Sequence, residues 1–449
     1  MFVISNYIAS FDWLLTLMYL MLVLFGAWLY KTYLHRTDPA YRWFMPALAL
    51  KMLGGIALVC IYGYYYGGGD IFAYFDGTQA LLNLTSSDPG ATLSFLVGNN
   101  SKEAFTSFNF QTGLPQFYLY IDSNTWAVSR FSYPFVALGV GRILPATILM
   151  NVFAFIGPWK LFRLLNQRYS GMTGRIAIAI LLIPSCIFWG SGMMKDGFTY
   201  AATLWLLYAA ISIALIRRQI IMNVFMILIN AYVIISIKPY IFIALMPAVL
   251  MLMLFTSVKA ISSRILRYVI VPSATIIIVV GGVYLYSALS PSLGTYGNFD
   301  DALEKAAVSR DDFTQNQTYS GNYFDIGSFD PSIQGILSKA HLALLYGLFG
   351  PFPWQANNIV MYISSLEAMG FLILFLLAFR NLLFRGAFRT LVSDPILLSF
   401  LLFVFVFIVF VGVSTANFGS LVRYRIPALP MFVFVLFMLI KKRAEFIKL

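Results

Sequence analysis

The stretch SGMMKDGFTY, residues 191–200, joins two apolar runs that are each about as long as a membrane-crossing helix. Lys195 and Asp196 stand side by side at this junction. Ionisable groups at membrane depth are unfavourable unless they pair or face a wet cavity. Pro184 and the small residues near it favour a broken or re-entrant helix. The stretch therefore predicts two membrane helices that meet at a polar break.

The composition of the chain is that of a membrane protein. Of its 449 residues, 60% are hydrophobic and only 11% are charged, which is more apolar material than a soluble domain could bury. The net charge of +12 could indicate nucleic acid, but Lys and Arg occur in twos and threes beside the apolar runs, where they act as topology signals. We therefore expect a polytopic integral membrane protein that binds no nucleic acid.

Cysteine and histidine are too sparse to predict a disulfide framework or a metal site. Cys60 and Cys186 both lie in apolar runs, where a buried free thiol is the ordinary interpretation. His35 and His341 are far apart in the chain. The acidic residues on the outer side could bind Mg²⁺ or Mn²⁺, but no ligand spacing requires an ion, so no metal site is predicted.

The apolar runs predict an all-α bundle of about eleven membrane helices, which forms a single transmembrane domain over residues 1–449. These helices are expected near residues 12–31, 43–65, 141–162, 175–192, 197–216, 219–237, 240–257, 268–288, 359–379, 395–413 and 426–440. Every alternate turn carries Lys and Arg, which predicts an outer N-terminus and a cytoplasmic C-terminus.

Two long segments, 66–140 and 289–358, then fall on the outer face of the membrane. Because the cytoplasmic turns are short by comparison, we expect the protein to act on this outer face. The stretch PSIQGILSKAHLALLYGLFG, residues 331–350, groups apolar residues after a polar loop. It predicts a short helix that lies on the membrane surface.

Several cations lie on the outer side, against the positive-inside trend. Besides Lys195, these are Lys238 in the tight turn IKPYIF and the pair Arg423 and Arg425 in TANFGSLVRYRIPALP. Arginine forks onto phosphate oxygens, so this group suits a lipid phosphate or pyrophosphate at the membrane surface. The simpler interpretation is that Lys195 and Asp196 neutralise each other, while the remaining cations cap helices or contact phospholipid headgroups.

Acidic residues on the same side are candidates for a general base and for substrate binding. Asp70 and Asp76 lie in YYYGGGDIFAYFDG at the outer exit of the second helix, where a carboxylate could take a proton from an attacking hydroxyl. Glu367 lies about eight residues into a predicted helix, which is unfavourable unless it faces a cavity or meets Arg423 or one of the outer lysines.

Aromatic side chains near these charges suggest a carbohydrate substrate. Tyr66 and Trp354 could stack on sugar rings, although aromatic side chains at this depth also form the ordinary interfacial belt. Nucleotide sugars are not normally available on the outer face, so sugar transfer there requires a lipid-linked donor. The phosphate of that donor leaves, and its developing charge must be stabilised.

Five short motifs follow one another along the chain: GGGD (67–70), SGMMKD (191–196), KPY (238–240), PFPW (351–354) and NFGSLVRYRIPALP (417–430). In these motifs the chain resembles the polytopic GT-C-type glycosyltransferases and related polysaccharide-assembly proteins of bacterial membranes. The resemblance covers most of the chain as an order of features. It implies a metal-optional transferase on the outer face of the bacterial cytoplasmic membrane, which moves a sugar from a polyprenyl-phosphate-linked donor to a glycan or lipid-linked acceptor. The base would be Asp70 or Asp76. The residues expected to bind substrate are Lys195, Asp196, Lys238, Glu367, Arg423, Arg425, Tyr66 and Trp354.

Two other functions stay open on the sequence. A polymerase or ligase that joins lipid-linked oligosaccharides would depend on Arg423 more than on Asp70. A non-enzymatic transporter of an anionic lipid or glycan would need a polar path to the cytoplasm. Apart from Lys51, the inner halves of the predicted helices are nearly free of charge, which offers little of such a path.

Overall fold

The computed structural model of this chain describes residues 7–259, 304, 308, 323–327, 329, 330, 332–384 and 387–440. Within these residues the elements are helices, with an isolated bridge between Tyr323 and Asn417 and no strand, so the all-α fold class is confirmed. The expected helix 268–288 and much of the outer segment 289–358 lie outside the described residues.

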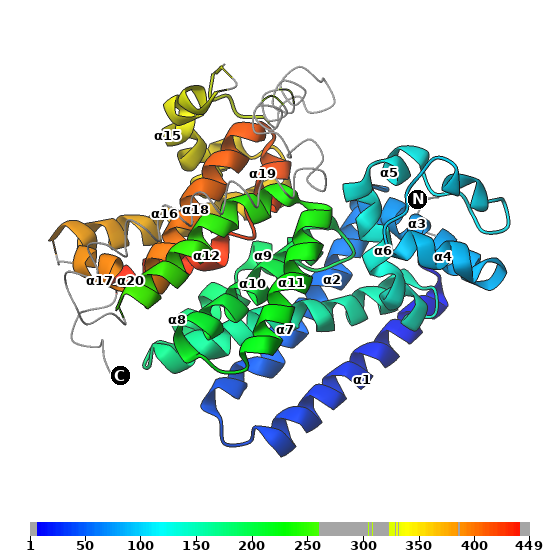
Figure 1. Cartoon of the computed structure of the whole chain (residues 1–449), viewed down its shortest axis with the longest axis horizontal. Coiled ribbons are helices and arrows are strands. Elements are labelled where there is room, and N and C mark those ends of the chain that lie inside the picture. The colour runs from blue at the N-terminus through cyan, green and yellow to red at the C-terminus, as the bar shows by residue number, and fades with distance from the viewer. Residues whose placement is uncertain are drawn as a thin grey trace. The chain divides into compact units, whose positions relative to one another are not determined.

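Long apolar helices run through much of the described chain (Figure 1). Eight spans in the described residues are long and apolar enough to cross a membrane. They contain α1 (Ser10–Leu34), α2 (Phe44–Cys60), α7 (Ile143–Arg168), α10 (Lys195–Ile211), α11 (Ile220–Ile237), α12 (Pro239–Lys259), α16 (Ile359–Phe384) and α18 (Pro395–Ser414). The polytopic character expected from the sequence is therefore present in the structure.

The shorter helices account for the difference from the expected arrangement. They are α3 (Asp70–Ser87), α4 (Pro89–Leu96), α5 (Phe117–Ile121), α6 (Ser123–Leu138), α8 (Thr173–Leu181), α9 (Pro184–Trp189), α15 (Ile333–Phe349), α17 (Ala387–Ser393), α19 (Phe418–Tyr424) and α20 (Leu429–Ile440). The expected helix 175–192 is two short helices, α8 and α9. The last expected helix, 426–440, corresponds to α20. It follows α19 at a bend of 72°, and this pair would bring the described spans to nine if it crosses as one.

The chain divides into two compact units, each built from separate stretches of sequence. Unit 1 comprises Met1–Arg163, Cys186–Trp205 and Ser236–Lys238. Unit 2 comprises Leu164–Ser185, Leu206–Ile235 and Pro239–Leu449. Membrane-length helices occur in both, α1 and α2 in unit 1 and α16 and α18 in unit 2.

The polar break predicted after Pro184 is confirmed. A lysine of unit 1 pairs with a backbone carbonyl at this break. Lys51 of α2 donates to the carbonyl of Gly190, just beyond the end of α9, at 2.5 Å. A helix end leaves such carbonyls unpaired, and lipid offers them no water. At Gly54, an added Cβ would lie 2.5 Å from the Ile187 carbonyl oxygen, so α2 approaches α9 at backbone distance.

The segment 66–140, which the sequence predicts to lie on the outer face, is a compact helical group in unit 1. Its helices α3, α4, α5 and α6 enclose a cluster of buried residues, namely Ala80, Leu81, Leu84, Phe95, Phe108, Tyr120 and Trp126. The Ser129 hydroxyl of α6 donates to the Tyr74 carbonyl of α3 at 3.1 Å. Gly77 allows this close approach, because a Cβ there would lie 2.8 Å from the Ser129 hydroxyl. The candidate acids of α3 are therefore held by a folded scaffold.

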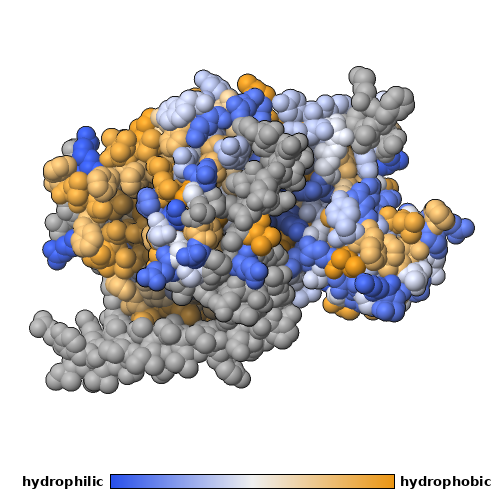
Figure 2. Space-filling model, turned by 90° about the horizontal axis from the view of Figure 1, so that it is seen from above, coloured by the Kyte–Doolittle hydropathy of each residue, from blue (hydrophilic) through white to orange (hydrophobic). Residues whose placement is uncertain are grey.

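In unit 2, α15 and α18 run antiparallel in contact. A Cβ at Gly412 would lie 2.4 Å from the Ala343 carbonyl oxygen, and a Cβ at Gly347 would lie 2.5 Å from Ile408. The stretch expected to lie on the membrane surface is thus packed along a membrane-length helix over at least one turn. Figure 2 shows apolar side chains over much of the visible surface, as expected of helices that face lipid.

Candidate functional site

Lys195 and Asp196 begin α10 in unit 1 and have different partners. Successive residues of an α-helix point about 100° apart, so two neighbouring side chains face different surroundings. Lys195 forms an ion pair with Asp122, whereas Asp196 forms one with Lys238. In the simpler interpretation Lys195 and Asp196 would neutralise each other, whereas in the structure each also forms an ion pair with a residue of another segment.

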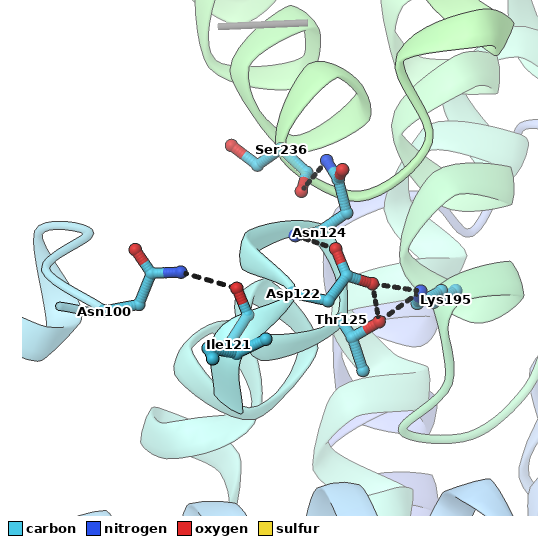
Figure 3. Close-up of polar contacts among 7 residues, drawn as sticks. All are labelled: Asn100, Ile121, Asp122, Asn124, Thr125, Lys195 and Ser236. Atoms are coloured by element: carbon cyan, nitrogen blue, oxygen red, sulfur yellow. Dashed lines mark hydrogen bonds and ion pairs between the residues drawn. The ribbon is translucent and has the colours of Figure 1, made fainter. Parts of the chain in front are cut away.

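Lys195 lies at the N-terminal end of α6 (Figure 3). Its ammonium donates to the Thr125 hydroxyl at 2.6 Å and lies 3.6 Å from the Asp122 carboxylate. The Thr125 hydroxyl in turn donates to Asp122. The side chain of Lys195 is 25% exposed and that of Asp122 is 49% exposed, so this group of charges is reached by solvent.

The same end of α6 is fixed by backbone contacts. Asp122 is the N-cap of the helix and accepts from the Asn124 amide at 3.2 Å. The Asn124 side chain donates to the Ser236 carbonyl at 3.0 Å, as Figure 3 shows. These bonds hold Asp122 and Thr125 in place when a ligand approaches Lys195.

Asp70 acts electrostatically on Lys195 from α3. It is the first residue of that helix and is exposed. Gly67, Gly68 and Gly69 precede it with φ of 70°, 152° and 128°, a backbone conformation that glycine adopts readily. The glycines turn the chain out of the preceding helix, and the carboxylate is favoured at the positive end of the next one.

Asp76 lies further along α3 and is half-buried. It accepts a hydrogen bond from the Tyr7 hydroxyl at 2.7 Å. Burial raises the pKa of the Asp76 carboxyl above its usual range, and the hydrogen bond from Tyr7 opposes this rise by stabilising the ionised form. Asp76 is thus engaged by Tyr7, and Asp70 is exposed.

Asp196 and Lys238 form a buried pair with 2.5 Å between carboxylate and ammonium. Their side chains are 2% and 7% exposed. The structure places both residues beneath the surface, where they contact each other. The sequence suggested that Asp196 and Lys238 bind substrate; the structure shows them as a buried ion pair, and substrate binding by them stays a prediction.

In unit 2, Glu367 accepts a hydrogen bond from the Ser185 backbone amide at 2.9 Å. Ser185 lies in the first turn of α9, so the carboxylate stabilises that helix end. The partner is a backbone group, whereas the sequence suggested a lysine or Arg423.

The two outer arginines of unit 2 differ in exposure. Arg423 is partly exposed on α19. Arg425 is fully buried and donates to the Gly350 carbonyl at 2.6 Å and to the Gly347 and Leu348 carbonyls at 3.3 Å. It closes the C-terminal end of α15, where a cation is favoured. The structure thus gives Arg425 a structural role, and the phosphate contact expected of it stays a prediction.

The aromatic candidates lie on the surface of their units. Tyr66 is exposed in unit 1, and its ring centroid lies 5.0 Å from that of Tyr65 in an edge contact. Trp354 is 77% exposed in unit 2 and stacks on Phe352 with a ring separation of 5.0 Å. Both are accessible to a sugar ring or to a membrane interface, and the choice between these stays a prediction.

Among the described residues, no three His, Cys, Asp or Glu side chains gather as ligands for a metal ion. The residues present do not form a ready-made site for Mg²⁺ or Mn²⁺, and we derive no chemical step through such an ion.

Sequence reasoning missed Asp122, Thr125 and Tyr7. The pattern DSNT, residues 122–125, is a recognisable helix N-cap and would have indicated that Asp122 begins a helix. Nothing in the sequence indicated that this helix end meets Lys195, because the two are 73 residues apart in the chain.

Comparison of the chain with family models, with curated proteins and with solved structures found no match.

Proposed function

We propose that this membrane protein is a glycosyltransferase of the outer face of the bacterial cytoplasmic membrane, which transfers a sugar from a polyprenyl-phosphate-linked donor to a glycan or lipid-linked acceptor. The observation that supports it most is the group formed by Asp70, Lys195 and Asp122 in unit 1. An exposed carboxylate acts there on a solvent-reached lysine that is itself oriented by Thr125 and Asp122.

Lys195 suits the phosphate of the donor. An ammonium has three N–H donors, and among the described residues Thr125 and Asp122 account for two of them. The third is left for an incoming oxyanion. Because Thr125 and Asp122 already fix the ammonium, little reorganisation is needed when negative charge develops on the leaving phosphate.

Asp70 is the preferred base. It is exposed, whereas Asp76 is half-buried and occupied by Tyr7. In the proposed step, Asp70 takes the proton of the acceptor hydroxyl and the hydroxyl oxygen attacks the anomeric carbon. The bond from that carbon to the phosphate oxygen breaks, and the polyprenyl phosphate leaves with the bonding electrons. Lys195 stabilises the new charge on that phosphate.

The alternative of an arginine-dependent polymerase or ligase has less support. Of the two arginines on which it would depend, Arg425 is fully buried and bound to the carbonyls that end α15. Arg423 is the one that is partly exposed. The experiment below separates the two functions by comparing Asp70 with Arg423.

The test is transfer by purified protein in nanodiscs, with radiolabelled polyprenyl-phosphate sugars as donors and candidate glycans as acceptors. We expect Asp70→Asn and Lys195→Met each to lower kcat by at least about 100-fold, the contribution typical of a general base or of a donor to a developing charge. Matched controls are Glu103→Gln and Lys102→Met, which remove exposed charges of the same outer segment. Both controls should retain wild-type transfer.

Two results would overturn the proposal. Full transfer by Asp70→Asn together with its loss in Arg423→Ala would indicate the polymerase or ligase. Tight binding of the lipid-linked sugar without any transfer, across the donors tested, would indicate a transporter or an assembly partner.

A further inference from the structure

Arg130 of α6 is buried in unit 1 without a partner for its charge. The residue is 7% exposed, and its Nε and Nη1 atoms are buried without hydrogen bonds. Among the residues that the structure describes, no carboxylate forms an ion pair with it. The nearest aromatic contact is the Phe131 ring, whose centroid lies 5.8 Å from the guanidinium carbon.

Such an arginine is unusual because buried donors in proteins are almost always paired. A buried charge without a counter-charge is strongly unfavourable, and arginine cannot lose its proton to relieve this. Nε and Nη1 are thus two guanidinium donors without an acceptor among the described residues, and each shares an edge of the guanidinium with Nη2. The residues that the structure describes do not supply the missing acceptor.

The surroundings of Arg130 carry a second donor and an apolar edge. Trp126 lies one turn earlier on the same face of α6, and its indole N–H is also buried without an acceptor. Gly98, just after α4, comes so close that a Cβ there would lie 3.1 Å from Nη1. Leu93 of α4 and Val97, which directly follows α4, are exposed one turn apart.

We infer that Arg130 is the centre of a second anion site in unit 1, which binds a phosphate group carried by an amphipathic lipid or by a soluble phosphorylated ligand. The guanidinium binds the phosphate oxygens through its fork. The exposed Leu93 and Val97 closely precede Gly98, whose backbone approaches the guanidinium, and such exposed apolar residues would favour the hydrocarbon part of a lipid.

This site is separate from the one at Lys195. Thr125 and Arg130 are five residues apart on α6, which places them on roughly opposite sides of the helix. The inference therefore does not depend on the proposed transfer reaction.

The test measures the thermal midpoint of unfolding of the full chain in a non-ionic detergent, with inorganic pyrophosphate titrated against sodium chloride of equal ionic strength. A ligand that binds the folded state raises Tm, and the rise grows as the ligand concentration increases above the Kd. We expect such a rise for the wild type and for the exposed control Arg218→Gln, and a smaller rise for Arg130→Lys and for Arg130→Met, in which the Lys195 site remains.

A parallel arm identifies the source of the phosphate. Nanodiscs of phosphatidylcholine are compared with nanodiscs that also contain phosphatidylglycerol. A rise in Tm with phosphatidylglycerol that Arg130→Met reduces would support the inference with a lipid as the ligand, whereas a rise with pyrophosphate alone would support it with a soluble ligand.

The unliganded variants check the folded state. We expect Arg130→Met to have a Tm equal to or above that of the wild type, since the substitution removes an uncompensated buried charge. If this variant does not fold, Arg130→Lys carries the test, because it keeps the charge and loses the fork. The inference is overturned if neither probe raises the Tm of the wild type, or if the Arg130 variants respond as the wild type does.

Discussion

Replacing Asp196 by Asn should destabilise the folded protein much more than the loss of a surface ion pair. The structure gives the reason: Asp196 and Lys238 lie 2.5 Å apart with side chains 2% and 7% exposed. The single substitution leaves the Lys238 ammonium buried without its counter-charge. Breaking a buried pair in this way costs about 3–5 kcal/mol, which is roughly two to four powers of ten in the unfolding equilibrium.

A double-mutant cycle measures this effect directly. Asp196→Asn, Lys238→Met and the double variant are unfolded in mixed micelles by increasing denaturing detergent, with tryptophan fluorescence as the signal. The double variant should be less destabilised than the sum of the single variants, because it leaves no isolated charge. Arg163→Gln serves as the control, since the Arg163–Asp38 pair has 31% exposed side chains and should contribute no more than about 1 kcal/mol.

The reasoning would be refuted by two outcomes. One is a loss below about 1 kcal/mol for each single variant, which is the range of exposed pairs. The other is strict additivity in the double variant, which would mean that the two side chains do not depend on each other.

Three further predictions follow from the geometry. Burial raises the pKa of the Asp76 carboxyl in the folded state. The stability that Asp76 contributes therefore declines as pH rises from about 4, the ordinary carboxyl pKa, through the raised pKa. Asp76→Asn should remove that decline from a plot of Tm against pH. Gly54→Ala should lower the free energy of unfolding by about 1–3 kcal/mol, because the added Cβ meets the backbone of α9. Gly26→Ala should not lower it, because nothing lies within 4 Å of an added Cβ there. Unfolding in detergent measures the free energy of both variants. In the same assay, Arg425→Met should lower the free energy of unfolding by about 1–3 kcal/mol, because it leaves the carbonyls at the end of α15 unpaired. Arg423→Ala should leave the free energy of unfolding near the wild-type value.

The sequence predicts the helical class and most spans because hydrophobic length is a local property. Residues 359–379 and 395–413 were expected to be helical, and α16 and α18 cover them. The break after Pro184 was also predictable, since proline removes a donor and disturbs the preceding turn. The bend between α19 and α20 was not, because it is the long-range contacts of Arg425 that hold that stretch of chain.

The candidate site was predicted in its charges but not in its pairings. Lys195 and Asp70 were identified because ionisable residues are unfavourable in an apolar chain. Their relation to Asp122 depends on α6, which lies in a segment expected to be an outer loop. Which carboxylate meets which ammonium is a matter of tertiary packing, and two neighbouring charges on one helix carry no information about it.

The interleaved construction of unit 1 has a consequence for biosynthesis. Asp196 and Lys238 are 42 residues apart, so a ribosome that adds about 5–20 residues per second delivers the lysine roughly 2–8 s after the aspartate. For that time the first helix of the pair enters the membrane with its acid unmatched. Insertion of α10 is therefore complete only after α11 has been synthesised, and the two helices are expected to leave the insertion machinery together.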